Sequence, residues 1–198
     1  MTSFRQTWTA VRALLILTVV LGLAYPLAIT GIGQLAFTNN ANGQLVRVDG
    51  EVVGSAIIGQ SFTDADGAAL PEWFQSRPSA AGDGYDGGAS SGSNWGPENE
   101  DLIAAIGERQ AAIAELDRVP VSEIPADAVT ASASGLDPHI SPEYARLQVD
   151  RVAAARGIPS EDVAKLVESM IQGRDLGYLG EPTVNVLKLN IALAEMDG

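Results

Sequence analysis

His139 is the only histidine in this chain of 198 residues, so any histidine-dependent hydrolysis would have to use it. Asp137 lies two residues earlier, with Pro138 between them, and supplies a carboxylate that could orient an imidazole. A Ser-His-Asp triad built from close neighbours in one tight turn would be atypical. We therefore interpret His139 as an ordinary turn residue.

Two glycine-containing segments carry paired aspartates of the kind that bind Ca²⁺. They are Asp64-Ala-Asp66-Gly67 and Asp83-Gly-Tyr-Asp86-Gly87. An EF-hand loop also needs a bidentate glutamate at its twelfth position, which neither segment has. We expect solvated loop acids there. A carboxylate pair for glycoside hydrolysis stays open among the 25 acidic residues, because spacing along the chain does not locate such a pair.

Motifs for nucleotide chemistry and covalent catalysis do not occur. A P-loop needs Gly-Lys followed by Ser or Thr, and neither Lys165 nor Lys188 has those neighbours. The sequence has no Asp-Lys-Thr-Gly phosphorylation motif and no cysteine, which excludes disulfides, thiolate zinc sites and thiol nucleophiles. The formal net charge of −13 excludes a nucleic-acid partner, because binding phosphates requires a basic surface. The sequence therefore predicts no catalytic residues and no metal site.

An uncharged N-terminal segment predicts a membrane span. Residues 13–32 are almost wholly apolar, and about 20 helical residues cross a hydrocarbon core of about 30 Å. Residues 1–40 carry two arginines and no acid, whereas residues 41–198 carry the other 10 basic and all 25 acidic residues. By the positive-inside rule, the N-terminus is expected in the cytoplasm and the remainder outside the cell membrane. We favour this anchor over a cleaved signal peptide, whose apolar core is usually shorter.

Several residues of the span predict that it packs against other membrane helices rather than serving only as a tether. Pro26 cannot donate a backbone hydrogen bond, so a kink is expected there. Small residues four apart allow close helix approach, and buried polar groups in a bilayer need partners. The candidate packing residues are Thr18, Gly22, Tyr25, Pro26 and Gln34.

Residues 41–198 predict a single α+β domain after the anchor of residues 1–40. Asp49-Gly50 between two β-branched runs indicates a hairpin with a type I′ turn. Residues 77–97 are rich in Gly and Ser and predict a long surface loop. Apolar residues at helical spacing then predict four helices. The first three begin near Glu98, at Ser141 and at Ser160, and the fourth covers residues 182–196. Gly157 is expected to end the second helix and Gly173 the third.

A series of motifs, in order along the chain, resembles the KdpC subunit family of the Kdp potassium-transporting ATPase. The motifs include Gly54-Ser-Ala-Ile-Ile-Gly-Gln60, Trp73-Phe-Gln-Ser-Arg77-Pro-Ser79, Ala89-Ser-Ser-Gly-Ser-Asn94, Val129-Thr-Ala-Ser-Ala-Ser-Gly-Leu-Asp-Pro-His-Ile140, Gln148 with Arg151, and Gly180-Glu-Pro182 with Asn185 and Asn190. Tyr25-Pro26 and Gln34 extend the resemblance into the span. Each motif alone is modest, but the ordered set is specific.

The resemblance implies a non-catalytic accessory subunit of an ATP-driven potassium uptake complex. Its partners would be KdpA, which translocates potassium, KdpB, which hydrolyses ATP, and the small peptide KdpF. The subunit would act as a catalytic chaperone that raises the ATP affinity of KdpB, so ATP enters only together with KdpB. The predicted topology conflicts with direct ATP contact by an outer domain, and favours coupling through the membrane helix.

The resemblance also marks candidate docking residues for KdpA or KdpB. They are Arg77, Asn94, Ser132, Ser134, Asp137, Gln148, Arg151, Asn185 and Asn190. A structural reading stays open for the turn from Ser132 to Asp137 and for Gln148, because serine, aspartate and amide side chains also cap turns and pair with buried backbone groups. The alternative function is a membrane-anchored extracytoplasmic binding domain or hydrolase unrelated to transport.

Overall fold

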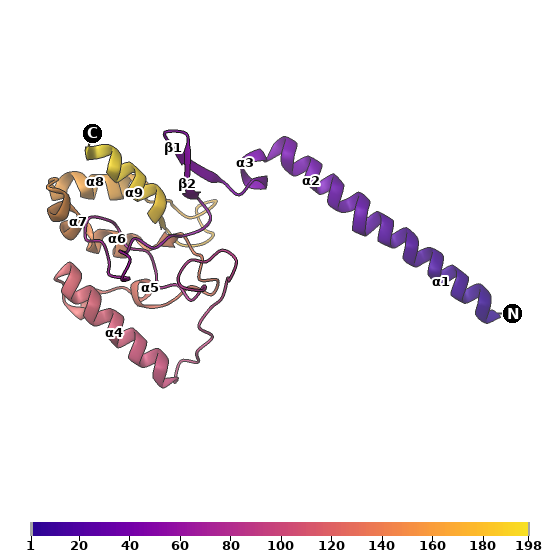
Figure 1. The fold of residues 1–198 in the computed structure, drawn as a ribbon, viewed down its shortest axis with the longest axis horizontal. Coiled ribbons are helices and arrows are strands. Elements are labelled where there is room, and N and C mark those ends of the chain that lie inside the picture. Colours follow the sequence, from indigo (N-terminus) through magenta and orange to yellow (C-terminus); the bar gives the residue numbers. More distant parts are fainter. Residues whose placement is uncertain (1, 198) are drawn as a thin grey trace. The chain divides into compact units, whose positions relative to one another are not determined.

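The computed structural model describes residues 2–197. The chain divides into two compact units, with the boundary between Leu45 and Val46. Figure 1 gives the order of the elements. The first unit is mostly helical, and the second combines helices with two sheets of two strands each. This mixed composition is the α+β domain that the sequence predicts.

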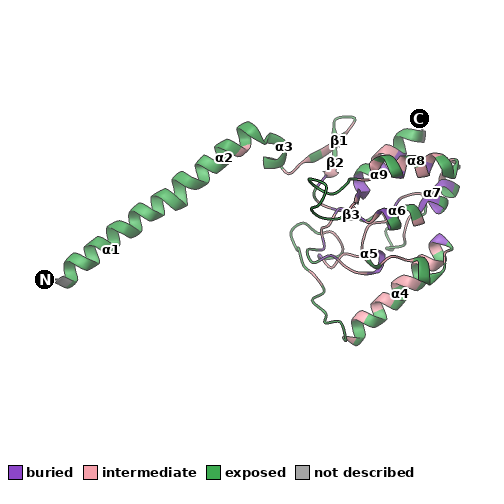
Figure 2. Cartoon of the chain, turned by 180° about the vertical axis from the view of Figure 1, so that it is seen from behind, coloured by how far each residue is buried: buried purple, intermediate pink, exposed green. Residues whose placement is uncertain are grey.

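The first unit is built on one long helical run. It comprises α1 (Thr2–Val19), a π-helical turn (Val20–Ala24), α2 (Tyr25–Ala36) and the short α3 (Thr38–Ala41). From Ser3 to Ala36 the run is long and apolar enough to cross a membrane, and none of its apolar window is buried within the chain (Figure 2). The expected span is therefore a continuous helix.

The irregularity predicted at Pro26 takes the form of the π-helical turn just before it. The backbone N–H of Tyr25 donates to the carbonyl of Val20, five residues earlier, instead of the usual four. Widening the helix by one residue accommodates a proline ring that would otherwise clash with the preceding turn.

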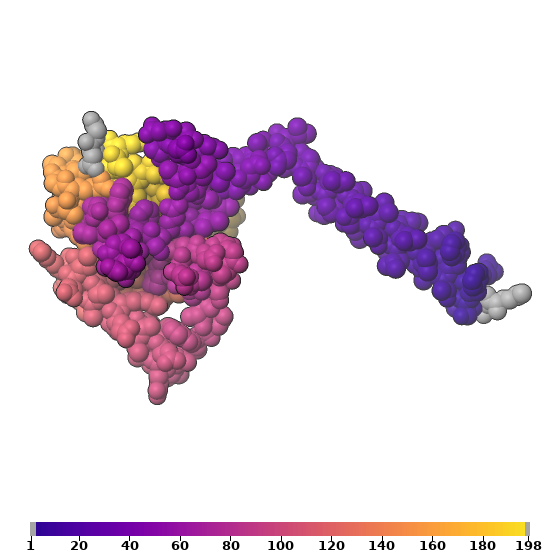
Figure 3. All heavy atoms as spheres, viewed as in Figure 1, coloured from indigo at the N-terminus to yellow at the C-terminus, as the bar shows by residue number. Residues whose placement is uncertain are grey.

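The hairpin of β1 (Leu45–Val48) and β2 (Glu51–Ser55) forms as predicted. Asp49 has φ +51° and Gly50 has φ +87°, and both positive angles are what a type I′ turn requires. Residues 56–99 then continue without a helix or a named strand, and Figure 3 shows this purple to magenta segment lying between the yellow C-terminal helix and the pink α4. The expected loop of residues 77–97 is present within this segment, but Ala81 on that loop and Phe74 just before it are fully buried.

The remaining elements follow in a compact series. Asn99 caps α4 by accepting a hydrogen bond from the Leu102 amide at 3.1 Å. The series is α4 (Glu100–Asp117), a 3₁₀ turn (Val121–Glu123), α5 (Ala126–Val129), β3 (His139–Ile140), α6 (Pro142–Leu147), α7 (Val149–Arg156), α8 (Ser160–Met170), β4 (Val184–Asn185), α9 (Val186–Ala194) and a 3₁₀ turn (Glu195–Asp197).

Three predicted helix boundaries are wrong. The helix that begins after Ser141 is split into α6 and α7 at Gln148, although Gly157 ends it as predicted, with φ +69°. The next helix ends at Met170, not at Gly173, because the Gln172 backbone pairs with that of Thr183. The last helix begins at Val186, because the two preceding residues pair with β3.

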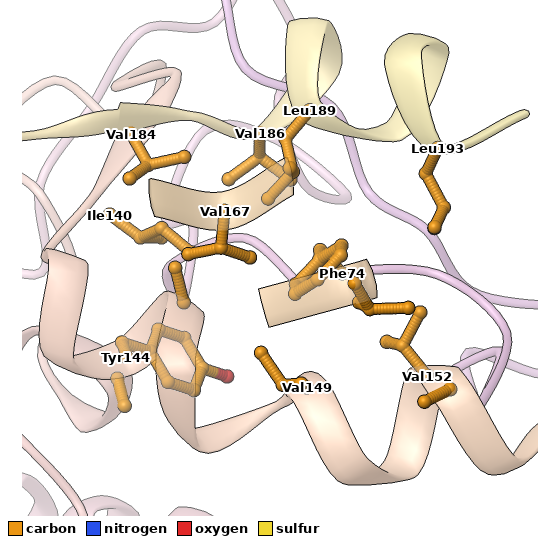
Figure 4. Close-up of a cluster of buried hydrophobic side chains, with 14 of the residues drawn as sticks. Phe74, Ile140, Tyr144, Val149, Val152, Val167, Val184, Val186, Leu189 and Leu193 are labelled. Carbon is orange, nitrogen blue, oxygen red and sulfur yellow. The ribbon is translucent and has the colours of Figure 1, made fainter. Parts of the chain in front are cut away.

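The core lies among α6, α7, α8 and α9, with one aromatic ring contributed by the loop (Figure 4). Burying a side chain such as Val or Leu contributes roughly 1.5–3 kcal/mol, so this cluster contributes strongly to the stability of the domain. Its members include Phe74, Ile140, Tyr144, Val149, Val152, Val167, Val184, Val186, Leu189 and Leu193.

Candidate functional site

The turn before β3 carries a charged cluster at the surface of the domain. An Nη1 of Arg77 donates to Oδ2 of Asp137 at 2.9 Å, and the two side chains are 22% and 31% exposed. The other carboxylate oxygen accepts the backbone N–H of His139 at 3.0 Å. The His139 Nδ1 lies 3.5 Å from the same oxygen. Loop and turn, 60 residues apart, are therefore joined by one ion pair.

The loop that carries Arg77 is held against the turn by hydroxyl groups. The Tyr85 hydroxyl donates to the Arg77 carbonyl at 2.8 Å, and the Ser79 hydroxyl donates to the Gly135 carbonyl at 2.6 Å. Gly135 has φ +68°, and a Cβ there would lie 2.7 Å from the Ala81 amide nitrogen. Only glycine allows this close approach.

The electrostatics of this cluster favour an ionised Asp137. Partial burial alone would raise its pKa, but hydrogen bonds from His139 and the charge of Arg77 outweigh burial, so the pKa lies below its ordinary 3.8. Burial raises the pKa of the Tyr85 hydroxyl to about 12, so it stays a neutral donor. The cluster is thus a fixed ion pair with a neutral hydroxyl beside it.

An open cleft of about 570 Å³ adjoins the ion pair. Apolar side chains including Pro125, Ile140 and Pro182 line it together with Arg77 and Asp137. Asp127 also lines it, but its two oxygens accept from the backbone and hydroxyl of Ser141 at 2.7 and 2.8 Å. Among residues 2–197, no three His, Cys, Asp or Glu side chains converge as metal ligands would. An apolar cleft with a charged edge is suited to contact with another protein surface.

A second polar cluster lies inside the domain and centres on Arg151. Its guanidinium donates to the Asp117 carboxylate at 2.6 Å, to the backbone carbonyls of Pro71 and Trp73 at 2.6 and 2.9 Å, and to the Gln148 side chain at 2.6 Å. The Arg151 and Asp117 side chains are only 5% and 1% exposed. One buried cation therefore joins α4, α7 and the loop.

Two buried amides fix the backbone of the same loop. Gln148 accepts from the Gln75 N–H at 2.6 Å and donates to its carbonyl at 3.2 Å. Asn190 does the same for Phe74, at 2.9 and 3.0 Å. These side chains replace the neighbouring strand that residues 71–75 lack, which explains how a segment without regular structure can enter the core.

Some of the residues singled out from the sequence belong to these two clusters, and others have separate partners. Arg77, Ser134 and Asp137 remain accessible. Ser132 is buried, and its hydroxyl accepts the Gly135 N–H. Asn94 is exposed and donates to the Gly92 carbonyl.

The other four candidate docking residues are inside the domain and have structural partners. They are Gln148, Arg151, Asn185 and Asn190, at most 9% exposed. Asn185 donates to the Ala56 carbonyl and caps α9. Their burial supports the structural reading that the sequence left open for Gln148.

Sequence reasoning missed Asp117 and Tyr85. Asp117 lies four residues after Ile113, on the apolar stripe of α4, and an acid on an apolar stripe is a signal for a buried ion pair. Tyr85 gave no signal, because its role depends on the fold of a glycine-rich loop.

The candidate packing residues of the membrane helix lie along its exposed surface. The Thr18 methyl group would lie 3.9 Å from a Cβ at Gly22, so the two form one shallow small-residue surface. Tyr25 is 60% exposed beside Pro26. Gln34 is not isolated, because its amide exchanges hydrogen bonds with the Asn42 amide at 3.1 and 3.4 Å. This pair of amides joins the last turn of α2 to the residue that follows α3.

Comparison with known proteins covers both units. The KdpC family model, described as "K+-transporting ATPase, c chain", matches residues 7–195. The chain belongs to the KdpC family. A KdpC subunit of Kineococcus radiotolerans is 55% identical over 96% of this chain and 93% of its own length. One from Caulobacter vibrioides is 58% identical over 89% and 86%, and one from Mycobacterium bovis is 53% identical over 96% and 97%.

The KdpC match includes the apolar helix as well as the domain. All three relatives carry the name "Potassium-transporting ATPase KdpC subunit". The matched region contains the helical run from Ser3 to Ala36 almost completely. This KdpC-family chain is therefore a membrane-anchored protein with one folded domain after its anchor.

Proposed function

We propose that this chain is a non-catalytic accessory subunit of an ATP-driven potassium uptake complex. The observation that carries the proposal is the family match, which runs through both helix and domain. The fold fits such a role, because its polar residues are used to fix the loop of residues 71–85, and the accessible ion pair of Arg77 and Asp137 edges an apolar cleft. This surface would contact a partner subunit.

The partners in this proposal are KdpA, KdpB and KdpF. The positive-inside rule, applied to Arg5 and Arg12, puts the N-terminus in the cytoplasm and the domain outside. ATP and KdpB's hydrolytic site lie inside, so the chain would raise the ATP affinity of KdpB without touching the nucleotide. The coupling would pass through the membrane helix, whose small-residue surface and π-helical turn allow close packing against another helix.

Co-purification tests the proposal. The chain would carry a C-terminal affinity tag and be co-expressed with KdpA, KdpB and KdpF, then extracted in mild detergent. We expect all four to elute together and to hydrolyse ATP, with a higher Michaelis constant for ATP in the complex that lacks the chain. Elution of the chain alone would favour the alternative of a membrane-anchored binding domain or hydrolase unrelated to transport.

A further inference from the structure

The segment between α8 and β4 presents the two most exposed large apolar residues among the described residues of the second unit, with a third close by. Leu176 is 82% exposed, Tyr178 is 69% exposed and Leu179 is 48% exposed. They lie together at the tip of a loop, named here the apolar loop (residues 172–183). All residues from 172 to 181 are exposed. Exposed apolar side chains that gather in one place are typical of interaction sites.

The apolar loop is held by pairs of backbone hydrogen bonds. Gln172 and Thr183 exchange two at its base, at 2.8 and 3.0 Å, and Asp175 and Leu179 exchange two nearer the tip, both at 2.9 Å. A salt bridge joins Arg174 to Glu181 across the loop. The tip is therefore preorganised, and binding would cost it little conformational entropy.

Backbone conformation also points to a role outside folding. Leu176 has φ +52°, a left-handed conformation that a branched side chain adopts only at a cost, and Gly177 follows with φ +82°. The Leu176 side chain is exposed to solvent, so packing within the domain does not compensate for the conformational cost. An external apolar partner that covers Leu176 and Tyr178 would compensate for this conformational cost.

The membrane that holds the anchor is the partner that fits best. Only residues 37–45 connect the helical run to the second unit, a maximum reach of about 30 Å even when fully extended. The domain is thus confined near a lipid surface at high effective concentration, where weak contacts suffice. Leucine and tyrosine are the residues that enter the interfacial layer.

We propose that the tip of the apolar loop inserts into the headgroup region of the membrane that anchors the chain. The net charge of −15 beyond residue 40 gives the domain no electrostatic attraction to anionic lipid. Insertion is therefore apolar, and zwitterionic lipid supports it equally well at low and high salt. The inference rests on the membrane anchoring in the proposed function, but not on any partner subunit.

The absence of cysteine from the chain makes a single-label experiment clean. The variant Leu176→Cys of the full chain would carry a bimane label and be placed in phosphatidylcholine nanodiscs containing lipid with a nitroxide near the top of its acyl chain. A matched control is Ile103→Cys, which is 58% exposed on α4. We expect the label at 176 to be quenched by nitroxide about twofold or more, and to be several-fold less accessible to aqueous iodide than the label at 103.

Other outcomes overturn the proposal in distinguishable ways. Equal iodide quenching at 176 and 103, without nitroxide quenching, would show that the tip stays in water. Iodide protection at 176 that arises only when partner subunits are added, again without nitroxide quenching, would show that protein covers it. A third label at Leu15→Cys reports on the anchor. Its failure to be quenched by nitroxide would remove the anchoring itself, and the inference with it.

Discussion

Arg151 satisfies four acceptors from three parts of the domain with one guanidinium group. Removing one partner of a buried pair leaves the other charge without compensation, which costs about 3–5 kcal/mol. We expect Arg151→Met to lower the free energy of unfolding by that amount, measured by urea denaturation of the full chain in detergent. Arg146→Met is the control, because its ion pair with Glu168 is about half exposed and should matter little. Equal stability of the two variants would contradict the structural role of Arg151.

Ionisation of Asp137 makes the stability of the folded domain depend on pH. Its pKa is lower in the folded domain than its ordinary 3.8, so the unfolded state binds more protons in this range and stability rises with pH. The stabilisation that ionised Asp137 provides is complete above about pH 5. It is lost as the pH falls through the pKa that Asp137 has in the folded domain. We expect Asp137→Asn to be less stable than the natural chain at pH 6 and closer to it near pH 3, by urea midpoints. A constant difference at both pH values would contradict this.

At the scale of elements, the contact between loop and turn depends on Gly135. Gly135→Ala would bring a Cβ to within 2.7 Å of two backbone atoms, the Ala81 nitrogen and the Ser91 oxygen, which cannot move aside as a flexible side chain would. Gly67→Ala is the matched control, since it has φ +83° but nothing within 4 Å. We expect the control to cost about 1 kcal/mol for its backbone conformation, and Gly135→Ala clearly more. Equal thermal shifts would mean that the close approach is relieved elsewhere.

The membrane helix carries features beyond its length. Replacing residues 13–32 by polyleucine keeps the span but removes the π-helical turn, the small-residue surface at Gly22 and the Tyr25 hydroxyl. We expect weaker assembly with KdpA and KdpB, measured as the fraction that co-elutes in detergent, because interhelical contacts in lipid depend on close packing. Unchanged assembly and transport would assign all docking to the domain.

For the molecule as a whole, the proposed effect on ATP hydrolysis depends on the orientation of the chain in the membrane. We expect protease added to intact spheroplasts to digest the domain and to leave a fragment that carries the N-terminal residues, because the basic side chains precede the span. A cytoplasmic marker protein serves as the control for leakage. Protection of the domain would contradict the topology and would reopen direct contact with nucleotide.

Features that depend on local rules could be predicted from the amino-acid sequence. An uncharged apolar run predicts a long helix, and Asp49-Gly50 predicts a type I′ turn, because each depends on chain neighbours alone. Ser141 caps a helix for the same reason, by accepting the Tyr144 amide. The ordered motifs also indicate the KdpC family, and the family match confirms this prediction.

Features that depend on contacts between residues far apart in the chain could not be predicted in this way. The last helix starts late because β4 pairs with β3, across more than 40 residues. Gln148 and Arg151 share a helical region in which surface and interior cannot be told apart by spacing, and their burial follows from the loop of residues 71–75 that they bind. Buried polar groups must be satisfied, and which backbone satisfies them is settled only when distant segments come together.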